Sequence, residues 1–78
     1  MGPQQLIKRS ITLKGHRTSL ALEAPFWDAL DQLARDRGQP LAQIITEVDA
    51  ERDGGLASAL RVLVLEAARA GQLASPKA

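Results

Sequence analysis

Polar and apolar residues alternate with a period of two along residues 9–23, RSITLKGHRTSLALE. This alternation predicts half-buried β-strands, because successive side chains of a strand point to opposite faces. Gly15-His16 suits a two-residue turn with Gly at the first central position, as in a type II′ hairpin. The pairs expected on the largely apolar face are Leu13 with Thr18, Ile11 with Leu20, and Arg9 with Leu22. In the alternative interpretation, only residues 17–22 form a strand and residues 9–14 are an arm.

The opposite face of this segment is polar and basic. Its members are Ser10, Thr12, Lys14, Arg17, Ser19 and Ala21. A two-stranded ribbon fits the major groove of B-DNA, where Arg pairs with guanine, Ser donates or accepts, and Ala contacts a thymine methyl group. Arg17, Ser19 and Ala21 stand at alternate positions, so together they would project from one side of the strand and read bases. A solvated basic edge strand that protects against aggregation is the other interpretation of the same pattern.

Phosphate contacts would supply most of the affinity of such a ribbon for DNA. Lys8 and Lys14 lie before and within the predicted hairpin and could hold phosphates through their charge. Backbone N–H groups at the start of a helix also bind phosphate. The segment Gly38–Ala42, which leads into the second predicted helix, is the best candidate for that contact.

From residue 25 onward the apolar positions follow helical spacing in three stretches. Pro25 suits a first helical residue, and Gly38 suits the residue that closes the first helix. The expected helices cover residues 25–37, 40–51 and about 56–70. The side chains expected in the core of a folded dimer are Leu20, Leu22, Phe26, Leu30, Leu33, Ile44, Ile45, Val48, Leu60 and Leu63.

The chain has 78 residues, which is enough for one domain with a small core. Small domains often gain stability by oligomerising. In the third predicted helix, Val62, Val64 and Leu65 widen the apolar stripe, so this helix should be buried on more than one side. A second subunit is the simplest cover. We expect a flexible arm over residues 1–8, a single domain over residues 9–71 and a frayed tail over residues 72–78.

The composition argues against several classes of protein. With one His, no Cys and no Tyr, the chain can hardly assemble a catalytic cleft, and neither a metal site nor a cofactor is expected. His16 is best interpreted as an exposed turn residue. No apolar run approaches the roughly 20 residues of a membrane span, and the first residues lack the apolar stretch of a signal peptide. The expected location is the cytoplasm.

The net charge of +1 is unevenly distributed. Residues 1–23 hold four basic residues and one acidic residue, a net charge of +3, whereas residues 24–78 hold six basic and eight acidic residues, a net charge of −2. A basic N-terminal third on a slightly acidic body favours a polyanion as the partner of the ribbon.

The order of these elements resembles the ribbon-helix-helix family, the Arc/MetJ-like DNA-binding dimers. TSLALE is similar to the ribbon of the family, PFWDALDQLARDRG to its first helix and QPLAQIITEV to its second. The fuller pattern, KRSITLKGHRTSLALE followed by FWDAL, ITEVDAER and LASALRVLVLE, looks closer to a mostly uncharacterised bacterial subgroup.

The resemblance implies a mainly α fold with a short β-ribbon and a third C-terminal helix, in an intertwined homodimer. In the family, the strands of two chains pair into one ribbon whose alternate residues read bases. By position these residues are Arg17, Ser19 and Ala21. The start of the second helix holds a phosphate through its backbone amides, a role that falls to Leu41 and Ala42. If residues 9–14 pair as an extra strand, the dimer sheet has four strands and enters a groove less easily.

The sequence therefore predicts a cytoplasmic, homodimeric DNA-binding protein that regulates transcription. The alternative is an obligate interaction dimer or antitoxin-like adaptor that does not read DNA. In that case, the third helix or the polar face of the sheet would dock a partner protein.

Overall fold

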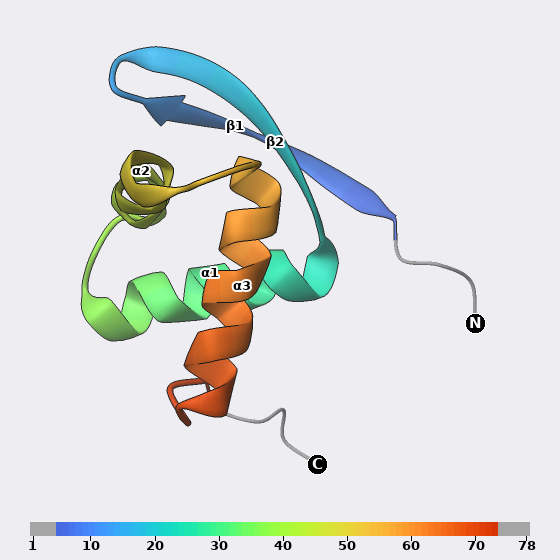
Figure 1. The fold of residues 1–78 in the computed structure, drawn as a ribbon, viewed down its shortest axis with the longest axis vertical. Coiled ribbons are helices and arrows are strands. Elements are labelled where there is room, and N and C mark those ends of the chain that lie inside the picture. The colour runs from blue at the N-terminus through green and yellow to red at the C-terminus, as the bar shows by residue number, and fades with distance from the viewer. Residues whose placement is uncertain (1–4, 74–78) are drawn as a thin grey trace.

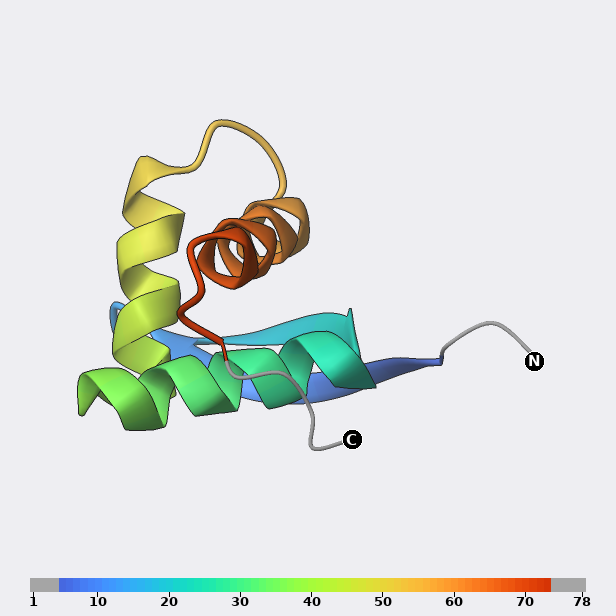
Figure 2. The same cartoon turned by 90° about the horizontal axis from the view of Figure 1, so that it is seen from below.

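The computed structural model describes residues 5–73, in which an antiparallel hairpin packs against three helices (Figure 1). The elements are β1 (Leu6–Leu13), β2 (His16–Glu23), α1 (Ala24–Arg37), α2 (Leu41–Glu51) and α3 (Leu56–Arg69). The hairpin lies along one side of the helices, and α2 stands nearly upright beside α1 when the molecule is seen from below (Figure 2). The predicted fold, mainly α with a short β-ribbon and a third helix, is confirmed.

The hairpin turn lies one residue earlier than predicted. Lys14 and Gly15 occupy its two central positions with φ values of 53° and 80°. Positive φ at both positions is the mark of a type I′ turn, whose twist matches the right-handed twist of the strands. The observed pairs on the largely apolar face are Leu13 with His16, Ile11 with Thr18, Arg9 with Leu20, and Ile7 with Leu22. The predicted register, with Leu13 opposite Thr18, is therefore wrong by two residues.

A shift of two residues leaves every side chain on its predicted face, because the period of a strand is two. The strand β1 begins at Leu6, so the arm predicted over residues 1–8 is too long. Ile7 continues the apolar face, and its carbonyl accepts a hydrogen bond of 2.7 Å from the indole Nε1 of Trp27. The interpretation of residues 9–14 as an arm is likewise wrong. Residues 1–4 of the predicted arm and 74–78 of the predicted tail lie outside the described residues.

The ends of α1 follow the sequence signals. Pro25 lies in its first turn, where a missing N–H has no cost. Gly38 adopts the left-handed conformation with φ of 64° and donates its amide to the carbonyl of Arg35 at 3.2 Å. The amide of Gln39 donates to the carbonyl of Ala34 at 3.0 Å. These bonds satisfy carbonyls at the end of the helix, as expected for a closing glycine.

The core lies between the hairpin and the helices. Its buried residues are Leu20, Leu22, Trp27, Leu30, Leu33, Ala34, Ile44, Ile45, Leu60, Val64 and Ala67. Seven of the ten expected core residues are in this set, whereas Phe26, Val48 and Leu63 are half-buried against it. Trp27, which the sequence analysis did not single out, is only 1% exposed. The core thus closes largely within one chain, and its place in a dimer stays a prediction.

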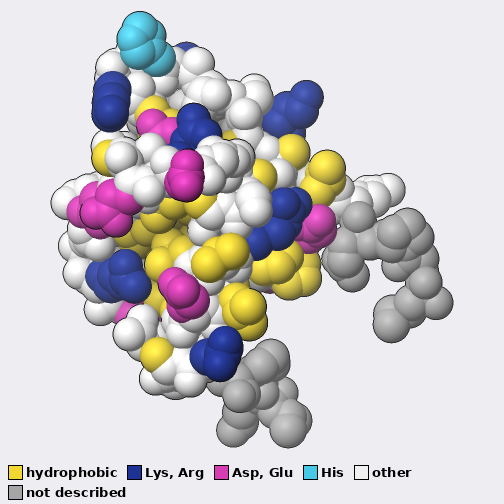
Figure 3. Space-filling model, viewed as in Figure 1, with side chains coloured by type: hydrophobic (Ala, Val, Ile, Leu, Met, Phe, Trp, Pro, Cys, Tyr) yellow, Lys and Arg dark blue, Asp and Glu magenta, His cyan; other side chains and the backbone are white. Residues whose placement is uncertain are grey.

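The third helix is buried on one side only. Leu60, Val64 and Ala67 point inward, whereas Val62 and Leu65 are 49% and 55% exposed. Figure 3 shows apolar side chains gathered on this face of the molecule, over α3 and in the hollow beside it. Among residues 5–73, no helix has the length and apolar character needed to cross a membrane.

Candidate nucleic-acid interface

The face of the hairpin that points away from the core collects the polar side chains of both strands. We call this face the outer face. It consists of Lys8, Ser10, Thr12, Arg17, Ser19 and Ala21. Five of the six are exposed and Ala21 is half-buried. The structure therefore brings all three predicted base-reading residues onto one accessible surface, because they alternate along β2.

The two strands place these side chains in direct cross-strand pairs. Ser10 lies opposite Ser19, Thr12 opposite Arg17, and Lys8 opposite Ala21. Arg17 also reaches diagonally across the ribbon, where its Nε donates to the Oγ of Ser10 at 3.4 Å. This bond uses Nε and leaves the Nη donors of Arg17 available to a ligand.

The positive charges near the outer face form no ion pairs with the acidic side chains of residues 5–73. Lys8 lies on the face itself, and Lys14 lies in the turn that ends the hairpin. Among the ion pairs of residues 5–73, none involves Lys8, Lys14 or Arg17. Figure 3 shows Lys and Arg side chains spread along the upper edge of the molecule, where the hairpin runs. This surface can attract an anion without first breaking a salt bridge.

The predicted phosphate contact of Leu41 and Ala42 lies at the start of α2, and not on the hairpin that carries the outer face. Leu41 and Ala42 are the first two residues of α2, and Pro40 precedes them. The amides of Gln43 and Ile44 both donate to the carbonyl of Pro40, at 3.0 and 3.4 Å. The amides of Leu41 and Ala42 precede the first intrahelical bond, so they have no partner within the helix. The helix α2 packs against β1. The first turn of α2 therefore belongs to a helix that contacts the hairpin.

Arg9 faces the opposite way from the outer face. Its guanidinium donates two hydrogen bonds to the carboxylate of Asp31, at 3.0 and 3.1 Å, and lies 4.5 Å from the centre of the Trp27 ring. The bonds to Asp31 raise the pKa of Arg9 above its ordinary value. Together with the bond from Trp27 to the carbonyl of Ile7, these contacts attach β1 to α1. The charge of Arg9 therefore serves to hold β1 against α1, and it is not part of the outer face.

Glu23, the one acidic residue of residues 1–23, forms an ion pair with Arg61. Its Oε1 accepts hydrogen bonds from the Nε and Nη2 of Arg61, at 3.0 and 2.8 Å. A hydrogen bond from its own backbone amide, and then those from Arg61, lower the pKa of Glu23. With Arg9 and Glu23 both paired, the local charge rests on Lys8, Lys14 and Arg17.

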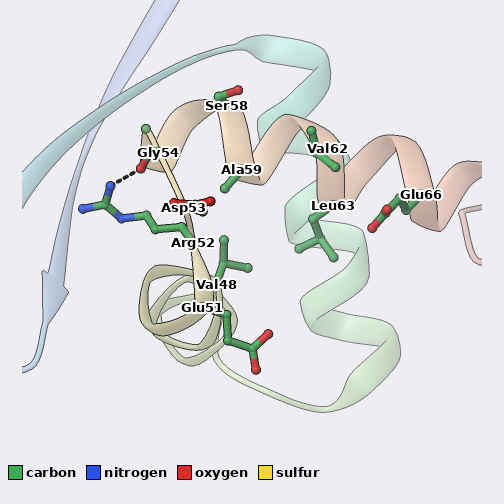
Figure 4. A pocket seen from close by; sticks show the side chains of 11 residues that line it. Val48, Glu51, Arg52, Asp53, Gly54, Ser58, Ala59, Val62, Leu63 and Glu66 are labelled. Atoms are coloured by element: carbon green, nitrogen blue, oxygen red, sulfur yellow. Dashed lines mark hydrogen bonds between the residues drawn. The ribbon is translucent and has the colours of Figure 1, made fainter.

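A groove of about 430 Å³ between α2 and α3 has a different character (Figure 4). Val48, Val62 and Leu63 give it apolar walls, and Glu51 and Glu66 line it with carboxylates. These carboxylates would repel a polyanion. Within residues 5–73, no group of three His, Cys, Asp or Glu side chains could hold a metal ion.

The side chain of Arg52, which lines this groove, forms hydrogen bonds with two nearby residues of the same chain. Its Nε donates to Asp49 at 2.7 Å, and its Nη1 donates to the carbonyl of Gly54 (Figure 4). Arg52 therefore closes the loop between α2 and α3.

Two features of this region were not predicted from the sequence. The link between Arg17 and Ser10 depends on the register, which the misplaced turn obscured. The cluster of Arg9, Trp27 and Asp31 joins β1 to α1 across a long stretch of chain and has no local signal. A basic residue at an apolar-face position was the available clue, because such a charge must find a partner when it is partly buried.

The chain belongs to the ribbon-helix-helix family: the family model described as "Ribbon-helix-helix domain" matches residues 6–68. Members of this family are typically transcription regulators that bind DNA as dimers. The family is regulatory and not enzymatic.

Among solved structures, the chain is similar to an uncharacterized protein from Bordetella pertussis Tohama I. The TM-score is 0.70 and the sequence identity 27%. The match covers 94% of this chain and 66% of that protein, so the chain spans just under two thirds of its length. No curated protein matches the chain.

Proposed function

We propose that this protein binds specific DNA sequences through the outer face of its hairpin and acts in the cytoplasm as a homodimeric transcription regulator. The proposal depends on the composition of the outer face. This face holds exposed hydrogen-bonding side chains, and positive charges that form no ion pair within residues 5–73, on a two-stranded hairpin. Membership of the ribbon-helix-helix family supports the same function.

Each residue of the proposed site has a distinct role. Arg17 offers Nη donors that fit the O6 and N7 acceptors of guanine, and Ser19 donates to or accepts from a neighbouring base. Ala21 contacts a thymine methyl group at the far end of the strand. Lys8 and Lys14 hold phosphates at two points along the ribbon, since Lys8 lies near the start of β1 and Lys14 lies in the turn that follows it.

The first turn of α2 adds a phosphate contact in this proposal. The amides of Leu41 and Ala42, which have no partner within α2, and the positive end of the helix dipole both favour an anion. Pro40 contributes no donor, so the contact is made by these two amides.

The exposed apolar face of α3 supports the proposed homodimer. Val62 and Leu65 are about half exposed, and with Phe26 they line an apolar depression of about 410 Å³. Covering such a patch with a second copy removes apolar surface from water and stabilises the pair. A dimer also carries two outer faces, which doubles the positive charge presented to DNA.

Fluorescence anisotropy across a salt series tests the proposed function. The purified protein is titrated into DNA from upstream of its own gene and into a scrambled duplex. We expect tighter binding to the upstream DNA and a steep negative slope of log K against log salt concentration. Weak, equal binding to both duplexes would contradict sequence-specific recognition.

The same apolar face of α3 favours a second candidate function, in which the protein is an interaction module that does not read DNA. A partner protein would then cover Val62 and Leu65 in place of a second copy. Stoichiometric co-purification of a partner, together with the absence of salt-sensitive binding to DNA, would establish this function instead.

A further inference from the structure

We infer that Arg61 of α3 is a positioning residue for DNA reading. It holds Glu23, the last residue of β2, and thereby fixes the orientation of the strand whose outer face reads bases. The inference rests on the proposed function and adds to it a residue that lies outside the ribbon. Arg61 itself contacts neither base nor phosphate, because it acts through the junction between β2 and α1.

The side chain of Arg61 joins α3 to both sides of this junction. Its Nε and Nη2 donate to the same oxygen of Glu23, Oε1, at 3.0 and 2.8 Å. Its guanidinium also lies 5.6 Å from the centre of the Phe26 ring, which is close enough for a cation–π attraction. Since Phe26 lies in the first turn of α1, one side chain contacts the end of the strand and the start of the helix that follows it.

The junction has no side-chain cap of its own. Glu23 is the residue that precedes α1, and among residues 5–73 no capping hydrogen bond joins its side chain to that helix. The helix α3 packs against both β2 and α1, beside the point where the strand runs into the helix (Figure 1). The bond from Arg61 therefore connects the junction to the body of the protein.

Arg61 holds β2 through the row of side chains that the core does not hold. Leu22 is fully buried, so the core fixes the strand through its apolar row. Successive side chains of a strand point to opposite faces, which puts Glu23 in the row of Ser19 and Ala21. Glu23 is the last residue of that row, two positions beyond Ala21. The contact with Arg61 thus fixes the end of the row that carries the proposed base-reading residues.

The pair of Arg61 and Glu23 is better suited to orientation than to stability. Their side chains are 34% and 26% exposed, and partly exposed ion pairs contribute little to the free energy of unfolding. A hydrogen bond from its own amide, and then those from Arg61, lower the pKa of Glu23, so the carboxylate is charged at neutral pH. Base-reading side chains must be held to within about 0.5 Å by the contacts that surround them. Two charge-assisted bonds onto one oxygen restrict the strand in this way.

The contact lies within one chain and uses side chains only. The bonds of Arg61 therefore do not compete with a second chain for the backbone groups along β2. In a dimer, each chain would carry its own Arg61 contact at the end of its own β2. Loss of the contact would then affect both halves of the DNA site.

The test removes the contact from either side. Wild type first selects a site from a library of randomised duplexes. Anisotropy then measures the affinity of each variant for this site and for a scrambled duplex. Arg61→Met retains a long side chain without donors, and Glu23→Ala removes the acceptor. The two substitutions change the charge in opposite directions, and a charge effect acts on both duplexes. The ratio of the two affinities therefore reports positioning.

Two further variants serve as controls. Arg69→Met removes a charge from the same helix, and Arg69 is exposed and forms no ion pair within residues 5–73. Arg61→Lys keeps the charge and one donor group. Circular dichroism and thermal unfolding establish that each variant folds, and Glu23→Ala carries the test if Arg61→Met does not fold.

We expect Arg61→Met and Glu23→Ala each to lower the ratio of affinities, selected site over scrambled duplex, by roughly fivefold. The double variant should lose no more than either single variant, because both substitutions remove the same contact. Arg61→Lys should recover part of the ratio, and Arg69→Met should keep the wild-type value. The slope of log K against log salt should stay unchanged in Arg61→Met, because no phosphate contact is lost.

A wild-type ratio in both single variants would overturn the positioning role of Arg61 and leave base reading by β2 intact. Additive losses in the double variant would also overturn it, since the two residues would then act separately. A salt slope shallower by about 1 in Arg61→Met would show that Arg61 contacts a phosphate directly, which contradicts the inference. If wild type selects no site, the proposed function is overturned, and this inference with it.

Discussion

Arg9 of β1 and Asp31 of α1 form an ion pair through two parallel hydrogen bonds, while the Arg9 guanidinium lies over the Trp27 ring at 4.5 Å. Trp27 also donates to the backbone of β1 at Ile7. One face of the strand is thereby tied to the first helix, and the other face remains open to a ligand. The cluster thus links packing to the proposed function, because the strand that carries Lys8 cannot detach without breaking it.

Trp27→Phe should weaken this attachment more than loss of the ion pair does. The substitution removes the indole donor, leaves the carbonyl of Ile7 without its partner and opens a small void at a fully buried site. We expect the free energy of unfolding to fall by about 2 kcal/mol. Urea denaturation followed by circular dichroism measures the loss.

Asp31→Ala is the comparison for Trp27→Phe. The side chains of Arg9 and Asp31 are 37% and 35% exposed, so water screens their attraction. We expect a loss of about 0.5 kcal/mol. A larger loss for Asp31→Ala than for Trp27→Phe would contradict the view that the indole, more than the ion pair, anchors β1.

The hairpin turn gives a pair of substitutions with opposite effects. Lys14 has a conformational cost at φ of 53°, a region that Asn tolerates better. Lys14→Asn should therefore raise the free energy of unfolding by about 0.5 kcal/mol. Gly15→Ala should lower it by about 1 kcal/mol through backbone strain alone, because a Cβ there meets open space. Equal stability of the two variants in urea denaturation would argue against a type I′ turn.

Lys14→Asn also separates stability from DNA binding. If Lys14 holds a phosphate, the variant should be more stable than wild type and yet bind every duplex more weakly. Its slope of log K against log salt should be shallower by about 1. An unchanged slope would remove Lys14 from the set of phosphate contacts.

The stability of the protein should decline in mild acid through Glu23. Hydrogen bonds from its own amide and from Arg61 depress the pKa of Glu23 below the ordinary value of 4.5. The unfolded chain then binds more protons than the native state, so stability rises with pH in this range. The contribution of Glu23 is fully present above its unfolded pKa and is lost as the pH falls through its folded pKa.

Urea denaturation of wild type and Glu23→Gln at a series of pH values checks this prediction. We expect wild type to be the more stable protein at neutral pH and the difference to shrink below about pH 4.5. A difference that stays constant with pH would mean that the bond to Arg61 does not depend on the charge of Glu23.

Adjacent residues of β2 should respond in opposite ways to a new charge. Leu20 is 7% exposed on the core side, so Leu20→Asp buries a carboxylate and should unfold the protein. Ser19 is exposed on the outer face, so Ser19→Asp should fold normally and lose affinity for DNA by charge repulsion. Circular dichroism and anisotropy distinguish the two outcomes. A folded Leu20→Asp variant would show that the two faces of β2 are assigned the wrong way round.

The sequence was sufficient to predict the faces of the hairpin and the three helices, because each depends on a short-range period. Alternation along residues 9–23 placed Arg17 and Ser19 on one face of the strand and Leu20 on the other, whatever the register of the hairpin. The register itself was missed, since a Lys-Gly centre is a weaker turn signal than Asn-Gly and only the twist of the folded strands decides between adjacent turns. Trp27 was missed for another reason. Phe26 and Trp27 are neighbours, and helical spacing alone did not determine which ring enters the core.

The most direct test of the central claim is the affinity of Arg17→Lys for a selected DNA site and for a scrambled duplex. Lys keeps the positive charge but cannot form the two-bond contact of Arg with guanine. We expect a loss of about 1–3 kcal/mol of binding free energy on the selected site, with unchanged binding to the scrambled duplex and an unchanged salt slope. Arg37→Lys, at the end of α1, should leave both affinities as in wild type. Wild-type preference for the selected site in Arg17→Lys would contradict base reading by the outer face of the hairpin.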